Sequence, residues 1–240
     1  MSRVINSILD NYKLEKKEVL EVCQIGKFVE VIDAEIQIVD KPKPPSPDFI
    51  ISYNGQIIGL EHTQIYSADR SRYLKIKTLL NNAEKKFREK YQDENLIASI
   101  SVKNDEFDYK QKDKPKLTEN IADYVYWTKN RIEFKLPNFI TEITTTKHDQ
   151  VSFWFDEKNW NNAEYLTRER LHAEILKKEP KIQEYRNSKQ NLSEYWLVLM
   201  IGSLSSVSYK LNESENYKMD SAFNRVYLMT DFDAKIIRIK

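Results

Sequence analysis

The chain has 240 residues, of which 40% are hydrophobic and 31% are charged, a composition typical of a folded globular protein and not of a disordered one. Its 38 basic and 37 acidic residues leave a formal net charge of +1, which excludes histone-like polycations and acidic-tail proteins. The length favours one domain over residues 1–240. The single cysteine, Cys23, excludes a disulfide framework and a cysteine-based zinc cluster, and it favours a reducing compartment.

Glycine content and hydropathy exclude further classes of protein. The sequence holds four glycines, at positions 26, 55, 59 and 202, so it cannot build a dinucleotide-binding fingerprint or a Walker loop. The most apolar stretch, residues 195–204, is about half as long as the ~20 residues that a membrane-spanning helix needs. We therefore expect a cytoplasmic protein with no membrane segment.

The first half of the chain predicts a helix, a hairpin, a second helix and a strand. Apolar residues recur at helical spacing over 15–31, and a short apolar stretch at 32–39 precedes a rigid, proline-rich loop at 41–47. Two apolar runs, 48–53 and 56–65, flank Asn54-Gly55, the preferred pair for a two-residue hairpin turn. Residues 70–90 then have helical periodicity, and 96–102 has the pattern of a strand. The predicted buried side of the second helix consists of Tyr73, Ile76, Leu80, Ala83 and Phe87.

The second half mixes helices and strands. Residues 117–129 indicate a helix, and 139–145 and 151–155 indicate strands. A long helical region spans 163–187, and Pro180 predicts a kink or a break within it. Strands are expected at 195–201, 225–230 and 235–239. This order of elements predicts an α/β protein with a mixed sheet flanked by helices.

The hairpin places two carboxylates together. With Asn54 and Gly55 at the tip, Asp48 and Glu61 fall opposite each other on one face, with Cβ atoms about 4.5–5.5 Å apart. Like charges in that position repel, so the pair must bind a divalent cation, share a proton or extend into water. Side chains alternate along a strand, so Thr63 points to the same side as Glu61, whereas His62 points to the other side.

These residues carry a resemblance to a known family. The segment Ser46-Pro47-Asp48-Phe49, followed thirteen residues after the aspartate by Glu61-His62-Thr63, resembles the PD-(D/E)xK nuclease superfamily. The resemblance covers about residues 15–104 and leaves 105–240 as a C-terminal extension of mixed helices and strands. It implies a restriction-endonuclease-like fold and a metal-dependent nuclease that hydrolyses phosphodiester bonds of nucleic acid, with DNA as the favoured substrate.

The resemblance also implies a metal site. Asp48 and Glu61 would bind Mg²⁺ or Mn²⁺, with the backbone carbonyl of His62 as a third ligand. The metal would stabilise charge on the phosphate and lower the pKa of an attacking water. A glutamate from the first helix often completes such sites, and Glu21 is the candidate here. The side chain of His62 is expected to be a packed core histidine.

One departure from the family pattern concerns the lysine that follows the glutamate by two residues, because that position is Thr63 here. A hydroxyl group orients a water molecule but supplies no positive charge. We expect the missing cation to come from the helix at 70–90, with Arg70 and Arg72 ranked above Lys77, and Lys75 last.

Two alternatives to the nuclease hypothesis stay open. In the first, the chain is a nucleic-acid-binding module of the same fold whose chemistry is weakened or lost because Thr63 replaces the lysine. In the second, it is a structural or interaction protein whose acid pair is only solvated. A nuclease cleaves with Mg²⁺ or Mn²⁺, a binding module binds in a salt-sensitive way without cleavage, and a structural protein does neither. A homodimer is compatible with the first two hypotheses.

Overall fold

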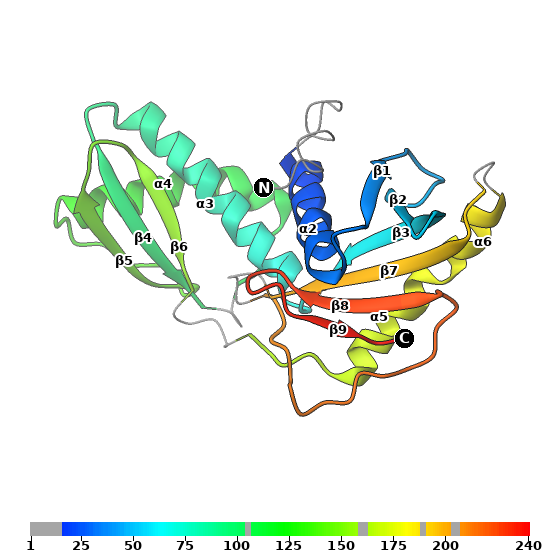
Figure 1. Ribbon diagram of the computed structural model, residues 1–240. Coiled ribbons are helices and arrows are strands. Elements are labelled where there is room, and N and C mark those ends of the chain that lie inside the picture. Colours follow the sequence, from blue (N-terminus) through cyan, green and yellow to red (C-terminus); the bar gives the residue numbers. More distant parts are fainter. Residues whose placement is uncertain (1–15, 104–106, 158–162, 188–190, 203–206) are drawn as a thin grey trace. The chain divides into compact units, whose positions relative to one another are not determined.

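The computed structural model describes residues 16–103, 107–157, 163–187, 191–202 and 207–240, and it divides the chain into two compact units (Figure 1). The first unit combines Met1–Tyr66 with Glu164–Lys240, and the second is Ser67–Ala163. The length predicts one domain over residues 1–240; within it, residues 67–163 form a compact unit with a sheet and helices of their own. The predicted α/β class with mixed sheets is confirmed.

The first unit is built on a six-stranded mixed sheet in the order β1-β2-β3-β7-β8-β9. The β3–β7 and β7–β8 pairs are parallel, and the other neighbours are antiparallel. Its strands are β1 (Gln37–Asp40), β2 (Phe49–Tyr53), β3 (Gln56–Gln64), β7 (Glu194–Ile201), β8 (Arg225–Thr230) and β9 (Ile236–Arg238). Strand β7 is apolar along nearly its whole length because both of its faces are covered.

Helices cover both faces of this sheet (Figure 1). Helix α2 (Lys16–Ile32) packs on one face, in a core cluster that includes Phe28, Leu60 and Trp196. Helices α5 (Arg168–Lys178) and α6 (Pro180–Asn187) pack on the other face, in a cluster that includes Leu197 and Leu199. The break between α5 and α6 falls at the proline, as the sequence predicts.

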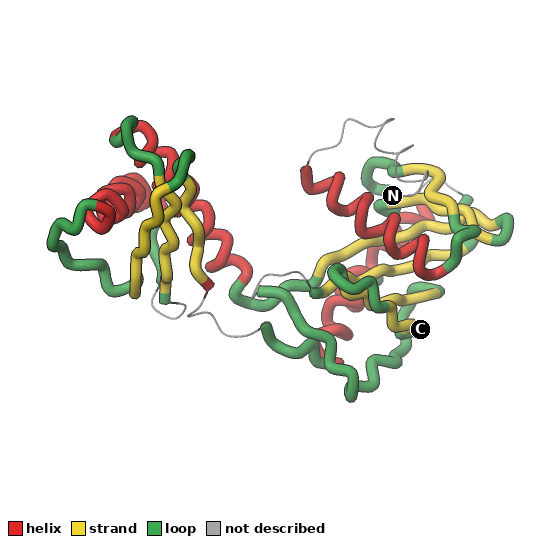
Figure 2. The backbone as a smooth tube through the Cα atoms, turned by 60° about the vertical axis from the view of Figure 1, so that its left-hand side comes forward, coloured by secondary structure: helices red, strands yellow, loops and turns green. Residues whose placement is uncertain are grey.

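The second unit has a three-stranded sheet in the order β5-β4-β6, with helices on one side of it (Figure 2). Its elements are α3 (Arg70–Lys90), β4 (Leu96–Val102), a 3₁₀ turn η1 (Gln111–Asp113), α4 (Lys114–Lys129), β5 (Ile140–Lys147) and β6 (Ser152–Asp156). The five apolar residues predicted to form the buried side of α3 are all buried. The bounds of α3 and β4 agree with the sequence prediction at both ends.

The β2–β3 hairpin has the predicted register. Tyr53 pairs with Gln56 and Phe49 pairs with Leu60, so the loop contains two residues. Asn54 and Gly55 have φ angles of 50° and 74°, the left-handed values that a type I′ turn requires at both central positions. Within the described residues, no helix is long and apolar enough to cross a membrane.

Candidate active site

The acid pair lies where β2 and β3 come together at the end away from the turn. Asp48 immediately precedes β2, and its Oδ2 accepts a hydrogen bond of 2.9 Å from the backbone N–H of His62. A Cβ atom at Gly59 would lie 2.7 Å from Cγ of Pro47, so glycine at this position lets Pro47 pack against β3. This close packing fixes the entry of the chain into β2 and holds Asp48 beside Glu61, as the hairpin register predicts.

Glu61 is almost completely buried, with 1% of its surface exposed, and both of its carboxylate oxygens accept hydrogen bonds. Its Oε1 accepts from Nζ of Lys178 at 2.9 Å and from Nζ of Lys181 at 2.6 Å. Its Oε2 accepts from the hydroxyl group of Tyr185. We call Asp48, Glu61, Lys178, Lys181 and Tyr185 the charge cluster. A carboxylate buried this deeply is stable only with such partners.

The local sequence explains how two lysines reach one carboxylate. Lys178 is the last residue of α5, and the break before Pro180 turns the chain so that Lys181 follows in the first turn of α6. Tyr185 lies four residues after Lys181 and therefore on the same side of α6. The side chains of Lys178 and Lys181 are 22% and 39% exposed, so the ammonium groups connect the buried Glu61 to solvent.

Burial and charge shift the two carboxylates in opposite directions. Burial, together with the charge of Glu61, raises the pKa of Asp48 to about 6, although the backbone N–H of His62 opposes this shift. Burial also acts to raise the pKa of Glu61, but hydrogen bonds from Lys181 and Tyr185 and the charge of Lys178 outweigh it and lower the pKa. Both groups are therefore mainly ionised at neutral pH, and two ammonium groups balance their charge.

The donors of the cluster keep their protons. Burial acts to lower the pKa of Lys181, but its hydrogen bond to Glu61 outweighs this effect and the pKa is raised. Burial and the hydrogen bond to Glu61 raise the pKa of Tyr185, so its hydroxyl group stays a donor. At neutral pH Glu61 is therefore an anion, and Lys181 and Tyr185 bond to it as a cation and a neutral donor.

His62 points to the opposite face of the sheet, toward α2, and is a core histidine as predicted. Burial lowers its pKa to about 4, so its imidazole is neutral at neutral pH. Glu21 is on α2, on this same face, and its carboxylate pairs with Nζ of Lys41 at 3.5 Å. The structure thus places Glu21 across the sheet from the carboxylate of Glu61, and the expectation that it completes the acid pair is not met.

Thr63 occupies the predicted position. It pairs with Leu199 in the sheet, on the face of Glu61, and is half-buried. The four cations expected to replace the missing lysine, Arg70, Arg72, Lys75 and Lys77, all belong to the second unit. Among their partners there, Asp69 lies 3.6 Å from Arg72, and Asp108 lies 3.1 Å from Lys75. Their part in the site stays a prediction, and the cations that contact Glu61 come from α5 and α6 instead.

Sequence reasoning missed Lys178, Lys181 and Tyr185. One signal was available, because Lys181, Tyr185 and the buried Ile182 share one side of a short amphipathic helix. Polar side chains next to an apolar stripe indicate a buried polar partner. The sequence pattern does not identify that partner as Glu61.

The carboxylates match part of what a divalent metal needs. Mg²⁺ is commonly held by one or two carboxylates, with water and substrate phosphate filling its other positions, and Asp48 and Glu61 supply two. No group of three or more His, Cys, Asp or Glu side chains suited to a metal exists within the described residues. The acid pair therefore fits a metal shared with substrate and does not form a complete protein cage.

Comparisons with protein-family models, with curated proteins and with solved structures find no match. The architecture is α/β with mixed sheets, and the restriction-endonuclease-like fold stays a prediction from the motif residues of the hairpin. Chemically, the charge cluster offers oxygen ligands for a cation next to two ammonium groups that attract an anion.

Proposed function

We propose that the chain is a metal-dependent nuclease that hydrolyses phosphodiester bonds of nucleic acid, with DNA as the favoured substrate. The observation that carries this proposal is the meeting of Asp48, Glu61, Lys178 and Lys181 at one end of the β2–β3 hairpin. The two carboxylates match the PD-(D/E)xK pattern, and α5 and α6 supply the positive charge that Thr63 does not.

Each residue of the cluster has a defined task in this proposal. Asp48 and Glu61 would hold Mg²⁺ or Mn²⁺, which when bound activates a water molecule and neutralises phosphate charge. Lys181 has the more exposed side chain of the two lysines, so it is the one to contact a phosphate and stabilise the negative charge that grows in the transition state. Tyr185 holds Oε2 of Glu61 in place, and the hydroxyl group of Thr63 is on the same face to orient water.

A plasmid-nicking assay with and without Mg²⁺ tests the proposal. Asp48→Ala and Glu61→Gln should abolish cleavage, because each removes one of the two carboxylates that would hold the metal. Lys181→Ala should lower turnover by about two orders of magnitude or more, the range seen when one charge-stabilising donor is removed. Lys177→Ala is the matched control, since Lys177 lies on α5 and pairs with Glu174. Cleavage that persists in Asp48→Ala contradicts the proposal.

Metal binding has a readout that is independent of cleavage. Mg²⁺ or Mn²⁺ should raise the unfolding temperature of wild type, because a ligand that binds only the folded state stabilises it. Asp48→Asn and Glu61→Gln should show no such rise. Equal responses from wild type and both variants mean that the acid pair does not hold the metal.

A second candidate function is a nucleic-acid-binding module without cleavage. The observation in its favour is that hydrogen bonds from the chain's own side chains already occupy both oxygens of Glu61. Salt-sensitive binding without nicking in Mg²⁺ or Mn²⁺ would support this alternative over a nuclease. With either function, we propose that the protein is cytoplasmic and forms a homodimer. Light scattering on the purified protein tests the dimer.

A further inference from the structure

A row of lysines on the second unit is separate from the charge cluster. Lys110, Lys112, Lys114 and Lys116 fall within seven residues, where the chain passes through η1 into α4. Three of them are exposed and Lys114 is half-exposed. None of the four forms an ion pair with any described residue. We call these four residues the lysine row.

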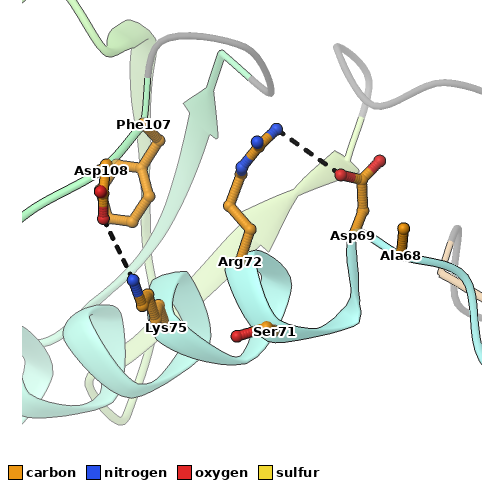
Figure 3. Close-up of a pocket in the computed structure, with 7 residues that line it drawn as sticks. All are labelled: Ala68, Asp69, Ser71, Arg72, Lys75, Phe107 and Asp108. Atoms are coloured by element: carbon orange, nitrogen blue, oxygen red, sulfur yellow. Dashed lines mark hydrogen bonds and ion pairs between the residues drawn. The ribbon is translucent and has the colours of Figure 1, made fainter.

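Two acids on either side of the lysine row in sequence are engaged by other cations. Asp108 pairs with Lys75 of α3 at 3.1 Å, beside a cavity of about 320 Å³ whose lining includes Arg72 and Phe107 (Figure 3). On α4, Asp123 accepts a hydrogen bond of 2.7 Å from Lys90. Among the described residues from 107 to 118, Asp113 is the one acid without an ion pair, so a single carboxylate stands against four lysines and the segment keeps a net positive charge.

The helix that follows adds to this positive field. The N-terminus of a helix carries a partial positive charge and usually attracts acidic side chains. Helix α4 has none in its first turn, and its N-cap residue, Asp113, makes no side-chain capping hydrogen bond. Helix α5 shows the ordinary arrangement, with a Thr167 cap that accepts from the N–H of Arg170 and with Glu169 in its first turn. The first turn of α4 therefore carries Lys114 and Lys116 where helices ordinarily place acidic side chains, and Asp113 is the one acid at this helix start.

The segment that carries the row is anchored. Phe107 is buried, and its ring centroid lies 5.3 Å from that of Phe139. The hydroxyl group of Tyr109 donates to the backbone carbonyl of Lys75 at 3.4 Å, and the N–H of Asp113 donates to the carbonyl of Lys110 at 2.9 Å. The lysines are thus presented from a fixed backbone, which lowers the entropy lost when they bind a ligand.

We propose that the lysine row is a binding surface for the phosphodiester backbone of duplex nucleic acid. Four solvent-accessible lysines within seven residues, without ion pairs among the described residues and next to a helix N-terminus, suit a ligand with closely spaced negative charges, and duplex DNA has a high density of them. This surface provides affinity without reading sequence, because phosphate contacts carry no base information. The inference goes beyond the proposed cleavage and does not depend on it.

The test measures binding of a fluorescein-labelled DNA duplex by anisotropy across a range of salt concentrations. All proteins carry Asp48→Ala, so that no cleavage occurs during the titration. The row variant combines Lys110→Gln, Lys112→Gln, Lys114→Gln and Lys116→Gln. The matched control removes the same charge from the same unit with Lys85→Gln, Lys86→Gln, Lys135→Gln and Lys147→Gln. Circular dichroism confirms that each variant is folded.

We expect the row variant to bind at least about tenfold more weakly at low salt. The slope of log K against log salt should fall by up to about 3.6, since each of four lost phosphate contacts removes about 0.9. The control should stay within about twofold of its parent. Equal losses in both variants, an unchanged row variant, or no salt-dependent binding by the parent overturns the inference. Wild type that binds through the row but never nicks DNA overturns the nuclease proposal instead, and leaves this inference standing.

Discussion

The two units of the chain place their charges in opposite ways. In the first unit, Glu61 is buried and is bonded by two lysines and a tyrosine from another part of the chain. In the second unit, the lysine row is at the surface without ionic partners among the described residues. A buried charge must be compensated by fixed partners or the fold loses stability, whereas an exposed charge is solvated by water. Charge in the first unit is therefore coupled to folding, and charge in the lysine row is available for a ligand.

The comparison predicts which substitutions affect stability. Changes to the charge cluster should alter the free energy of unfolding strongly, and changes to the lysine row should leave it nearly constant. Chemical denaturation in metal-free buffer measures these changes in the free energy of unfolding.

Removing both cations from Glu61 should have the largest effect. The double variant Lys178→Met/Lys181→Met leaves a buried carboxylate with one donor, so the free energy of unfolding should fall by about 3 kcal/mol. Adding Glu61→Leu to this variant should restore most of the loss, because an apolar residue needs no partner. The exposed Lys177→Met is the control and should change stability by less than about 0.5 kcal/mol. A double variant as stable as this control means that Glu61 is adequately solvated without its lysines.

Neutralising Asp48 should raise the free energy of unfolding by an amount that depends on pH. Burial and the charge of Glu61 raise the pKa of Asp48 from 3.8 to about 6, so the folded state binds a proton at Asp48 more tightly than the unfolded state does. The stability that this proton contributes is complete below about pH 4 and is lost as the pH rises through 6. Asp48→Asn should therefore be about 2 kcal/mol more stable than wild type near pH 7.5, with the difference vanishing below pH 4. A stability difference that stays constant from pH 4 to 7.5 would contradict this prediction.

Removing the hydroxyl group of Tyr185 should have an intermediate effect. Tyr185→Phe keeps the ring but deprives Oε2 of Glu61 of its donor, which should lower the free energy of unfolding by about 1.5 kcal/mol. Tyr217 also donates a buried hydrogen bond, but to the carbonyl of Leu166, which is neutral. Tyr217→Phe should therefore lose less, and a loss equal to that of Tyr185→Phe would show that the charge of Glu61 adds nothing.

Neutralising the lysine row should have the smallest effect. The fourfold glutamine variant should keep its free energy of unfolding within about 0.5 kcal/mol of wild type, with any change toward greater stability, because like charge is removed from the N-terminus of α4. A large destabilisation would show that the lysines support the fold, and the contrast between the two units would no longer hold.

Local sequence patterns were sufficient to predict much of the fold. The Asn54-Gly55 turn determines the hairpin register, and that register places Asp48 beside Glu61. Helical periodicity gives α3, and Pro180 marks the break between α5 and α6. These features depend on residues close together in the sequence, so they can be read from it.

The features that were missed depend on distant residues. Lys178 lies 117 residues after Glu61, and Tyr185 lies 124 residues after it, so no local pattern links them. The division into two units was missed for a related reason, since β3 pairs with β7 across the whole second unit. The helix at 70–90 was correctly predicted, and it belongs to the second unit, whereas the lysines that contact Glu61 come from α5 and α6 of the first unit, which the sequence pattern did not single out.

The second unit interrupts the first as a continuous insertion, and this has a consequence for biosynthesis. The chain leaves the first unit at Tyr66, which bridges to Ser208, and returns beside Tyr165, which bridges to Lys210, so the two crossing points lie on one short segment. During translation, Glu61 is synthesised long before Lys178 and Lys181. The inserted unit can therefore fold before the two lysines that bond to Glu61 are present. A short flexible linker joining Tyr66 directly to Glu164 would remove that delay and let the sheet close around Glu61 sooner.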